Sequence, residues 1–309
     1  MSKLTRREMI LAKIETSYNT DSTPDGSNAI LVENLSWSNE GSRMVERPVI
    51  KNTLAPEKQI FAGTLRQMSF DVEIKGSGTA DAPPEFGSLL RACGFGEDIV
   101  TGTSVTYLPA SSGIESITIY YYEDGTLYKV TGARGNVSVD LTTGSVGKLS
   151  FTFTGHVDDG TDEAAPAPTF VDTVPPAIIE VPFTVGSFSA AVTQLQFDMS
   201  NTVATPEVIN APDGYGEIRV TGRDVSGSFN PEAELKATED FILDWKNGVD
   251  KSINTGVVGG TAGNQYEIKL PQAHYREVSP SDRDSVRTYD VSFGASEVSA
   301  DDEVEMIFT

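Results

Sequence analysis

The sequence has very few of the side chains on which most catalytic and metal sites depend. Its 309 residues include one cysteine, Cys93, and two histidines, His156 and His274. A single cysteine excludes an intrachain disulfide framework and a thiolate metal site. The motifs of nucleophile-elbow hydrolases, P-loop enzymes, zinc proteases and dinucleotide-binding proteins do not occur in a fitting context. We therefore expect no cofactor, no metal and no enzymatic activity.

Long apolar runs and clusters of basic residues are also missing. No segment approaches the roughly 20 apolar residues of a transmembrane helix, and the apolar run at residues 9–12 is too short for a secretory signal. The 23 Lys and Arg are outnumbered by 45 Asp and Glu, which gives a formal net charge of -22. A nucleic-acid-binding surface needs clustered cations, whereas this balance repels a polyanion. We expect no membrane association, folding in a reducing cytoplasm and no specific binding of DNA.

Alternation of apolar and polar residues is abundant and predicts the fold class. In residues 68–75, 148–157 and 287–294 nearly every second side chain is apolar, and those between carry mostly hydroxyl or charged groups. This period of two is typical of half-buried β strands with one polar face. The Glu-Asp-Gly turn at residues 123–125 predicts a hairpin. Further strands are expected at residues 29–37, 115–122, 127–130, 136–141, 194–199, 217–220, 266–270 and 304–308.

Helical periodicity occurs in only two short segments, residues 83–94 and 238–248, each of which closes on a glycine. An acidic, Pro- and Ala-rich linker at residues 158–176 separates the two halves. Its carboxylates are candidate Ca²⁺ ligands, but the twelve-residue EF-hand pattern is missing and a solvated linker is favoured. The sequence thus predicts a mainly β protein with two tandem domains, residues 1–157 and 177–309, each with one short flanking helix.

The two halves resemble each other in the order of their features. RPVIKN at residues 47–52 matches TPEVIN at residues 205–210, and RQMS at residues 66–69 matches RDVS at residues 223–226. The predicted helices follow these matches in both halves, and a strand with alternating residues ends each half. This conserved order favours an internal duplication.

Three stretches of the first half resemble major tail tube proteins of long-tailed, sipho- or myovirus-like bacteriophages. They are AKIETSYNTDSTPDGSNAILVENLSW at residues 12–37, ERPVIKNTLAPEKQIFAGTLRQMSFDVEIKGSG at residues 46–78 and PEFGSLLRACGF at residues 84–95. The resemblance covers about residues 8–156 and extends to the second half only through the internal repeat. In that family the fold is a β-sandwich or partial barrel with one flanking helix, and six such domains close a ring.

For this chain the resemblance implies a structural virion protein. Two domains per chain would make a homotrimeric, pseudo-hexameric ring, and stacked rings would form the hollow tail tube that conducts DNA into the host cell. The implied partners are further copies of the chain and the tape-measure, tail-tip and tail-terminator proteins. DNA would pass through the lumen without specific binding, and assembly would take place in the host bacterial cytoplasm.

The resemblance also implies roles for two groups of residues. A similar loop in relatives contacts the next ring, which makes Arg47, Lys51, Glu57 and Lys58 candidates for contacts between stacked rings. The polar faces of the alternating strands would line the lumen. The candidates for that wall are Ser69, Asp71, Glu73, Ser150, Thr152, Ser226, Ser228, Thr288, Asp290 and Ser292.

Two other classes of function are open at this point. A carbohydrate- or receptor-binding β-sandwich module of a phage tail or fibre would display an exposed aromatic platform, for which Tyr120, Tyr121 and Tyr122 are candidates. An acid–base hydrolase would need two carboxylates with separated pKa values in one cleft. The sequence nominates no such pair.

Overall fold

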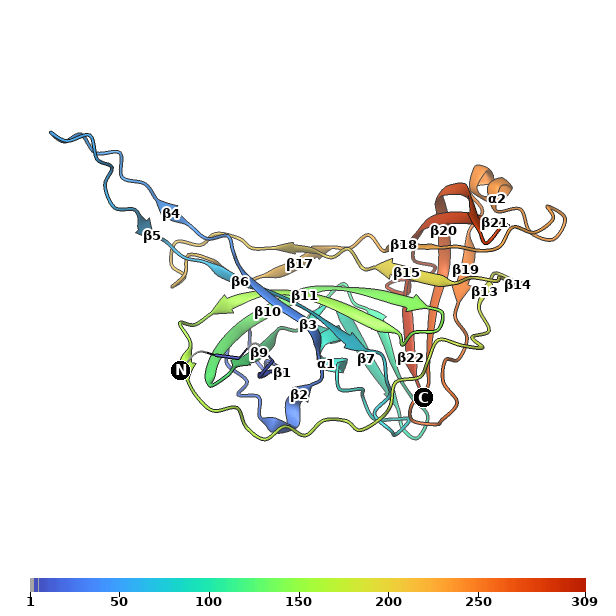
Figure 1. Ribbon diagram of the computed structural model, residues 1–309, viewed down its shortest axis with the longest axis horizontal. Helices are drawn as coiled ribbons and strands as arrows, with labels where there is room; N and C mark the ends of the chain where they lie inside the picture. The colour runs from blue at the N-terminus through green and yellow to red at the C-terminus, as the bar shows by residue number, and fades with distance from the viewer. Residues whose placement is uncertain (1–2, 5) are drawn as a thin grey trace.

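A central antiparallel sheet runs through both halves of the chain in the computed structural model, which describes residues 3–4 and 6–309 (Figure 1). Each strand of this sheet is paired with the next along its edge. In spatial order the strands are β3 (Glu33–Glu40), β6 (Leu65–Glu73), β11 (Lys148–Val157), β10 (Thr126–Thr142), β15 (Gln194–Asp198), β18 (Ser226–Phe229), β21 (Val286–Ala295) and β20 (Tyr266–Arg283).

The halves contribute equally to this sheet. The first supplies the set β3, β6, β11 and β10, and the second supplies β15, β18, β21 and β20, in which each strand occupies the place of its counterpart. The two sets join where β10 pairs with β15, from Ser138↔Asp198 to Thr142↔Gln194. The matching strand order supports the internal duplication that the sequence favours.

Outer strands pack behind the central sheet because β10 and β20 are long enough to belong to two layers. The first half of β10 pairs with β9 (Ile117–Glu123), and the first half of β20 pairs with β19 (Lys251–Asn254) and β22 (Glu305–Phe308). The other outer strands are β1 (Glu8–Ile14), β2 (Ala29–Ile30), β7 (Phe95–Val100), β8 (Ser104–Pro109), β12 (Thr161–Asp162), β13 (Thr184–Val185) and β14 (Phe188–Ser189).

Short elements complete the fold. Helix α1 (Gly87–Ala92) and helix α2 (Phe241–Asn247) lie in the predicted segments, and α2 is capped by the Asp240 carboxylate and ends at Gly248 in the left-handed conformation. The remaining elements are two two-stranded ribbons and a 3-10 turn: β4 (Met44–Val45) with β5 (Ile60–Phe61), β16 (Thr202–Ala204) with β17 (Arg219–Gly222), and η1 (Gly26–Asn28).

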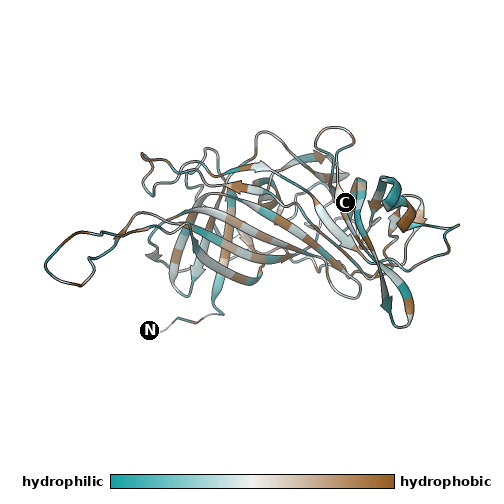
Figure 2. Ribbon diagram, turned by 90° about the horizontal axis from the view of Figure 1, so that it is seen from above, coloured by the Kyte–Doolittle hydropathy of each residue, from teal (hydrophilic) through white to brown (hydrophobic). Residues whose placement is uncertain are grey.

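The apolar face of the central sheet forms one core that extends through both halves. In the first half the rings of Phe70, Phe151 and Phe153 pack together with centroids 5.8–6.0 Å apart, and in the second half Phe229 packs against Phe241 and Phe293. All six belong to a single buried cluster. Brown patches alternate with pale or teal ones along the sheet strands in Figure 2, as expected for strands with one buried face.

Several local predictions are confirmed, and others are incomplete. The predicted hairpin joins β9 to β10 through Asp124 and Gly125, both with positive φ, as a type I′ turn requires. The runs at residues 127–130 and 136–141 are one strand, β10, and residues 266–270 are only the start of β20. The sequence did not predict β1, whose Ile10 and Leu11 are fully buried. The predicted domain boundaries stay a prediction, although residues 161–162 of the expected linker form β12 on β10.

Candidate functional site

The polar face of the central sheet brings together most of the predicted wall residues. Ser69 and Thr152 lie within 3.1 Å of each other across β6 and β11, and Ser150 donates a hydrogen bond to Asp71 at 2.6 Å. These contacts place the four side chains on one face of the sheet. On this face Ser150, Ser228 and Asp290 are exposed, whereas the half-exposed candidates are Ser69, Asp71, Glu73, Thr152, Ser226 and Ser292.

Thr288 differs from the other candidates because its side chain is only 3% exposed. It lies on β21 opposite Ser281 and also forms an isolated bridge with Glu232 in the segment after β18. The alternation along β21 therefore does not expose this hydroxyl in the single chain.

Cross-strand partners on this face form rows that pass from the first half into the second. One row runs through Glu33, Asp71, Ser150, Ser138, Asp198 and Ser226. A second row runs through Glu73, Lys148, Asp140, Gln196, Ser228, Ser292 and Glu277. Both rows cross at the β10–β15 junction, so the polar face is continuous.

Sequence reasoning missed the members of these rows that lie on β10 and β15. Residues 136–141 and 194–199 were predicted as strands, and their alternation already separates Ser138 and Asp140 from the buried Val137 and Val139. The polar face could therefore have been assigned there from the same signal. What the alternation does not indicate is that these two strands are neighbours.

The electrostatics of the face are acidic. Its one lysine in the two rows, Lys148, pairs with Glu33 at 2.6 Å, and this hydrogen bond raises the pKa of the lysine. Asp71 accepts hydrogen bonds from Asn34 and Ser150, and Asp198 accepts one from Asn136. Rows of carboxylates and hydroxyls with a single paired cation offer little to replace the counterions of a polyanion.

At one end, the second half covers the same face of the first. Leu65, Tyr215 and Ile218 form a small buried cluster between the halves. The Tyr215 hydroxyl donates to the Gly41 carbonyl, and the Arg43 guanidinium lies 4.1 Å from the centroid of the Tyr215 ring. Residues 205–218, which we call the docked segment, are thereby fixed on the first half.

His156 belongs to this contact between the halves. Its Nδ1 lies 2.6 Å from Asp213 Oδ2, and its Nε2 lies 3.0 Å from the Tyr18 hydroxyl. That hydroxyl accepts a hydrogen bond from the Ile218 N–H at 2.7 Å, so its own proton can go to Nε2. His156 therefore links the first half, through Tyr18, to Asp213 of the second half.

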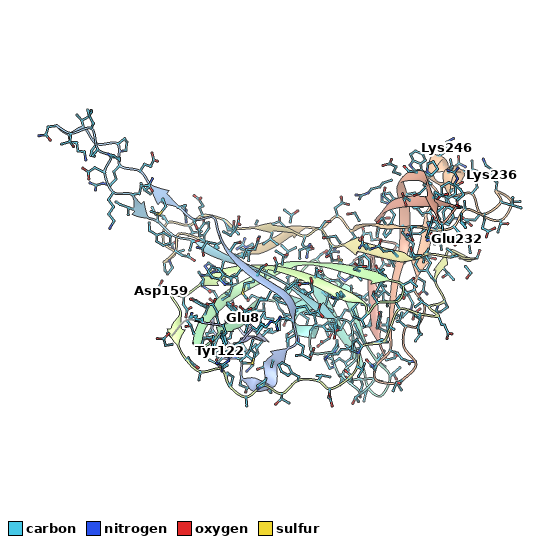
Figure 3. All side chains as sticks on the ribbon, in the orientation of Figure 1. Glu8, Tyr122, Asp159, Glu232, Lys236 and Lys246 are labelled. Carbon is cyan, nitrogen blue, oxygen red and sulfur yellow. The ribbon has the colours of Figure 1, made fainter. Side chains whose placement is uncertain are left out.

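Residues 46–59, which we call the arm, project away from the molecule (Figures 1 and 3). The structure places all four predicted ring-contact residues on the arm. Lys51 and Glu57 pair with each other at 2.8 Å, whereas Arg47 and Lys58 form no ion pair within the described residues. Ile50 and Leu54 are fully exposed, at 104% and 106% of their reference areas. The arm therefore presents cations and unpacked apolar side chains together.

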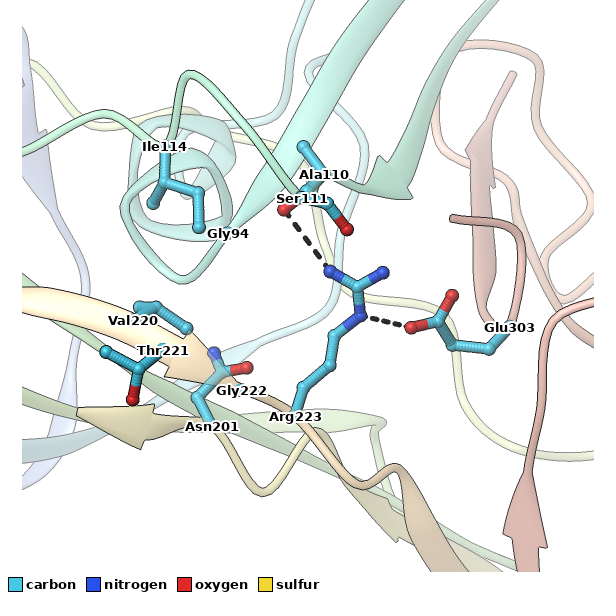
Figure 4. Close-up of a pocket in the computed structure, with 10 residues that line it drawn as sticks. All are labelled: Gly94, Ala110, Ser111, Ile114, Asn201, Val220, Thr221, Gly222, Arg223 and Glu303. Carbon is cyan, nitrogen blue, oxygen red and sulfur yellow. Dashed lines mark hydrogen bonds and ion pairs between the residues drawn. The ribbon is translucent and has the colours of Figure 1, made fainter. Parts of the chain in front are cut away.

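A pocket between the halves holds an arginine in a structural network (Figure 4). The Arg223 guanidinium donates to the Ala110 carbonyl at 3.2 Å and pairs with Glu303 and Asp301. Burial works against the charged form of Arg223, but the hydrogen bonds to the two carboxylates outweigh it and raise the pKa. The arginine links the first half to the C-terminal strand region.

The remaining candidates from the sequence are accounted for by packing. Tyr120, Tyr121 and Tyr122 are all buried, so they form no exposed aromatic platform. Cys93 is buried, and burial raises its pKa, so it is an unreactive thiol.

Within residues 3–4 and 6–309, no group of three or more potential metal ligands is close enough to bind an ion. In the same part of the chain, no helix has the length and apolarity to cross a membrane.

Two comparisons with known proteins bear on the family of this chain. A search of curated proteins finds no significant match. The family model described as phage tail tube protein matches residues 5–295, which is nearly the whole chain.

Proposed function

The chain belongs to the phage tail tube protein family, and from this premise we propose that three copies close a pseudo-hexameric ring whose stacking builds the hollow tail tube. DNA passes through the lumen of this tube into the host cell. The role is structural and non-enzymatic. The partners along the axis are further copies and the tape-measure, tail-tip and tail-terminator proteins, and assembly takes place in the host bacterial cytoplasm.

The observation that carries the proposal is the continuous sheet of two equivalent four-stranded sets. The sets join through β10 and β15, which leaves β3 at one end of the strand order and the last part of β20 at the other. Within the described residues, β3 pairs only with β6, and residues 277–283 of β20 pair only with β21. Unpaired edges of this kind are normally avoided, and closure into a barrel removes them.

The dimensions of such a ring suit a DNA conduit. Three copies with eight strands each, spaced about 4.8 Å apart and tilted ~40°, give a circumference of roughly 150 Å and a backbone diameter of roughly 48 Å. Side chains that project inward reduce this diameter by about 10 Å. The remaining lumen is wide enough for a hydrated B-DNA duplex.

The polar face supplies the wall of the proposed lumen. Its carboxylates repel the phosphates of DNA, and its hydroxyls carry no charge that would attract them. DNA can therefore slide through without the counterion release that drives binding. Nine of the ten predicted wall residues have exposed or half-exposed side chains on the central sheet, and Thr288 is left out because it is buried. The row members on β10 and β15 join this wall.

The arm supplies the contact between stacked rings. In a chain with a net charge of -22, the arm carries three Lys and Arg against two Glu, so it is attracted to the acidic surface of another copy. Arg47 and Lys58 provide charge for this contact, and Ile50 and Leu54 provide apolar area. Lys51 and Glu57 hold the arm in shape through their ion pair.

Light scattering across concentration, followed by negative-stain electron microscopy of the heaviest fraction, tests the proposal. We expect a mass of three chains and stacked hollow rings. A protein that stays monomeric at high concentration, with and without added tail-tip complex, would overturn it.

A further inference from the structure

Inside one chain, the sheet of the first half pairs with the sheet of the second half through β10 and β15. In the ring proposed above, on which this inference rests, the sheet of the second half must in turn pair with the first half of the next copy. The strands available for that contact are the two unpaired edges, the last part of β20 and β3. We propose that β20 of one copy pairs with β3 of the next in the register of the internal β10–β15 junction.

Strand equivalence between the halves determines that register. RQMS and RDVS align Ser69 on β6 with Ser226 on β18. The β-strand partner of Ser69 is Ser36, and the partner of Ser226 is Asp198, so Ser36 on β3 is equivalent to Asp198 on β15.

The same steps on the other side of each set relate β10 to β20. Asp71 and Ser228, two residues further along β6 and β18, are paired with Ser150 and Ser292. Ser150 is paired with Ser138, and Ser292 is paired with Glu277. Glu277 is therefore equivalent to Ser138.

The internal pair Ser138↔Asp198 then predicts Glu277 of one copy opposite Ser36 of the next. One step along, Asp140↔Gln196 predicts Ser279 opposite Glu33. The equivalences also place Val278 of one copy opposite Leu35 of the next.

The side chains at the open edges fit this register. Val139 and Phe197 meet on the apolar face of the internal junction. Their equivalents, Val278 and Leu35, are apolar and already pack against the same core. The polar pairs all fall on the opposite face, so the polar wall continues from copy to copy. A slip of one residue would place Val278 among wall residues, which disfavours other registers.

The backbone hydrogen bonding of the two junctions differs at one position. Leu141 pairs with Leu195 inside the chain, and its equivalent in β20 is Pro280. Tyr289, opposite Pro280, donates its N–H to Pro231 on the far side of β21, so by alternation the backbone of Pro280 faces the open edge. Proline has no N–H to donate. The junction between copies therefore has one hydrogen bond fewer than the internal one, a common protection of exposed edges.

Cysteine cross-linking tests the register. Ser36→Cys and Glu277→Cys are combined in one chain, in a Cys93→Ala background, and assembled protein is oxidised. Equivalence to Ser138↔Asp198 makes this a non-hydrogen-bonded pair, with Cα atoms about 4.5 Å apart and within disulfide range. We expect covalent oligomers of up to three chains on a non-reducing gel, and none from either single variant.

Two matched variants define the outcome. Ser138→Cys with Asp198→Cys should cross-link within one chain, which shows that this geometry is competent. Ser38→Cys with Glu277→Cys shifts the pair by two residues on the same face, beyond the roughly 7 Å that a disulfide can span, and should not cross-link.

The outcomes separate the register from the ring. Rings and tubes that form normally but show no Ser36–Glu277 cross-link, or show one equally well in the shifted variant, would overturn the register and leave the proposed function standing. Chains that remain monomeric in every variant and in the parent would overturn both.

Discussion

The arm and the docked segment occupy the same place in the two halves and have the same length, yet they behave in opposite ways. The arm, residues 46–59, connects β4 to β5, and the docked segment, residues 205–218, connects β16 to β17. The arm projects into solvent, whereas the docked segment lies on the first half (Figure 1). The same element of the duplicated fold therefore packs against its own chain in the second half and projects without such a contact in the first half.

One aromatic side chain and the glycines beside it explain most of this difference. Tyr215 is buried at the contact with Gly41 and Arg43, while the arm contains no aromatic residue. A Cβ on Gly214 would lie 2.5 Å from the Arg43 guanidinium, and the φ of Gly214 is +75°. Glycine at this position lets the tyrosine approach closely. The arm has apolar side chains but no surface in its own chain to receive them.

The largest expected effect comes from removing the end of the arm. Deletion of residues 52–58 should leave folded trimers but abolish tubes, because the ion pair that the deleted Glu57 makes is with Lys51 of the arm itself and, as proposed, the deleted residues contact the next ring. Circular dichroism and light scattering check the fold and the trimer, and negative-stain microscopy checks the tubes. Long tubes formed by the deletion variant would refute the role of the arm.

Truncation of Tyr215 should show that the docked segment contributes to the stability of the fold and that the arm does not. Tyr215→Ala removes a buried ring and should lower the free energy of unfolding by about 3 kcal/mol. Leu54→Ala on the arm is the matched control, and it should change the value by less than about 0.5 kcal/mol because the side chain is exposed. Denaturant unfolding measures both. Equal effects would show that the docked segment contributes nothing to the fold.

The internal junction and the proposed junction between copies differ by one backbone hydrogen bond, and one substitution should remove this difference. Pro280→Leu restores the residue type and the N–H of Leu141, so the contact between copies should gain about 1 kcal/mol, or roughly fivefold in trimer dissociation. Dissociation on dilution, followed by light scattering, provides the measurement. An unchanged or weaker trimer would argue against Pro280 lying at the junction.

The smallest effect concerns the charge at the end of the docked segment. The hydrogen bond from Arg134 at 2.9 Å is the main cause that lowers the pKa of Glu217. Because the pKa is lowered on folding, the stabilisation is present above the ordinary value of 4.5 and is lost as the pH falls through the folded-state value. Glu217→Gln should therefore lower the free energy of unfolding by about 0.5 kcal/mol at pH 7 and leave it unchanged near pH 2. The value at pH 7 is small because water screens a side chain that is 36% exposed.

The matched control for this charge is Glu57→Gln on the arm, where the ion pair with Lys51 holds no other part of the chain. Denaturant unfolding of both variants at the two pH values should show a pH-dependent difference only for Glu217→Gln. A difference that persists at pH 2 would mean that the contact does not depend on the ionised carboxylate.

Much of the local structure could be predicted because alternation and turn chemistry act over a few residues. Residues 148–157 were predicted as a strand and form β11, and both short helices lie in the predicted segments. β1 was missed because its buried residues, Ile10 to Ala12, form a short run without clear alternation. Thr288 has the alternation of a wall residue, but its side chain is buried in the folded chain, where Glu232, distant in sequence, pairs beside it.

The sequence by itself determined the mainly β class, the polar and apolar faces of most strands, the two helices and the acidic charge balance. These properties depend on residue spacing and composition. Only the tertiary structure decided that β10 meets β15, that one of two equivalent segments is docked and the other open, and that the wall residues form rows. These outcomes depend on contacts between residues far apart in the chain, and no local pattern specifies which strand edges or surfaces will meet.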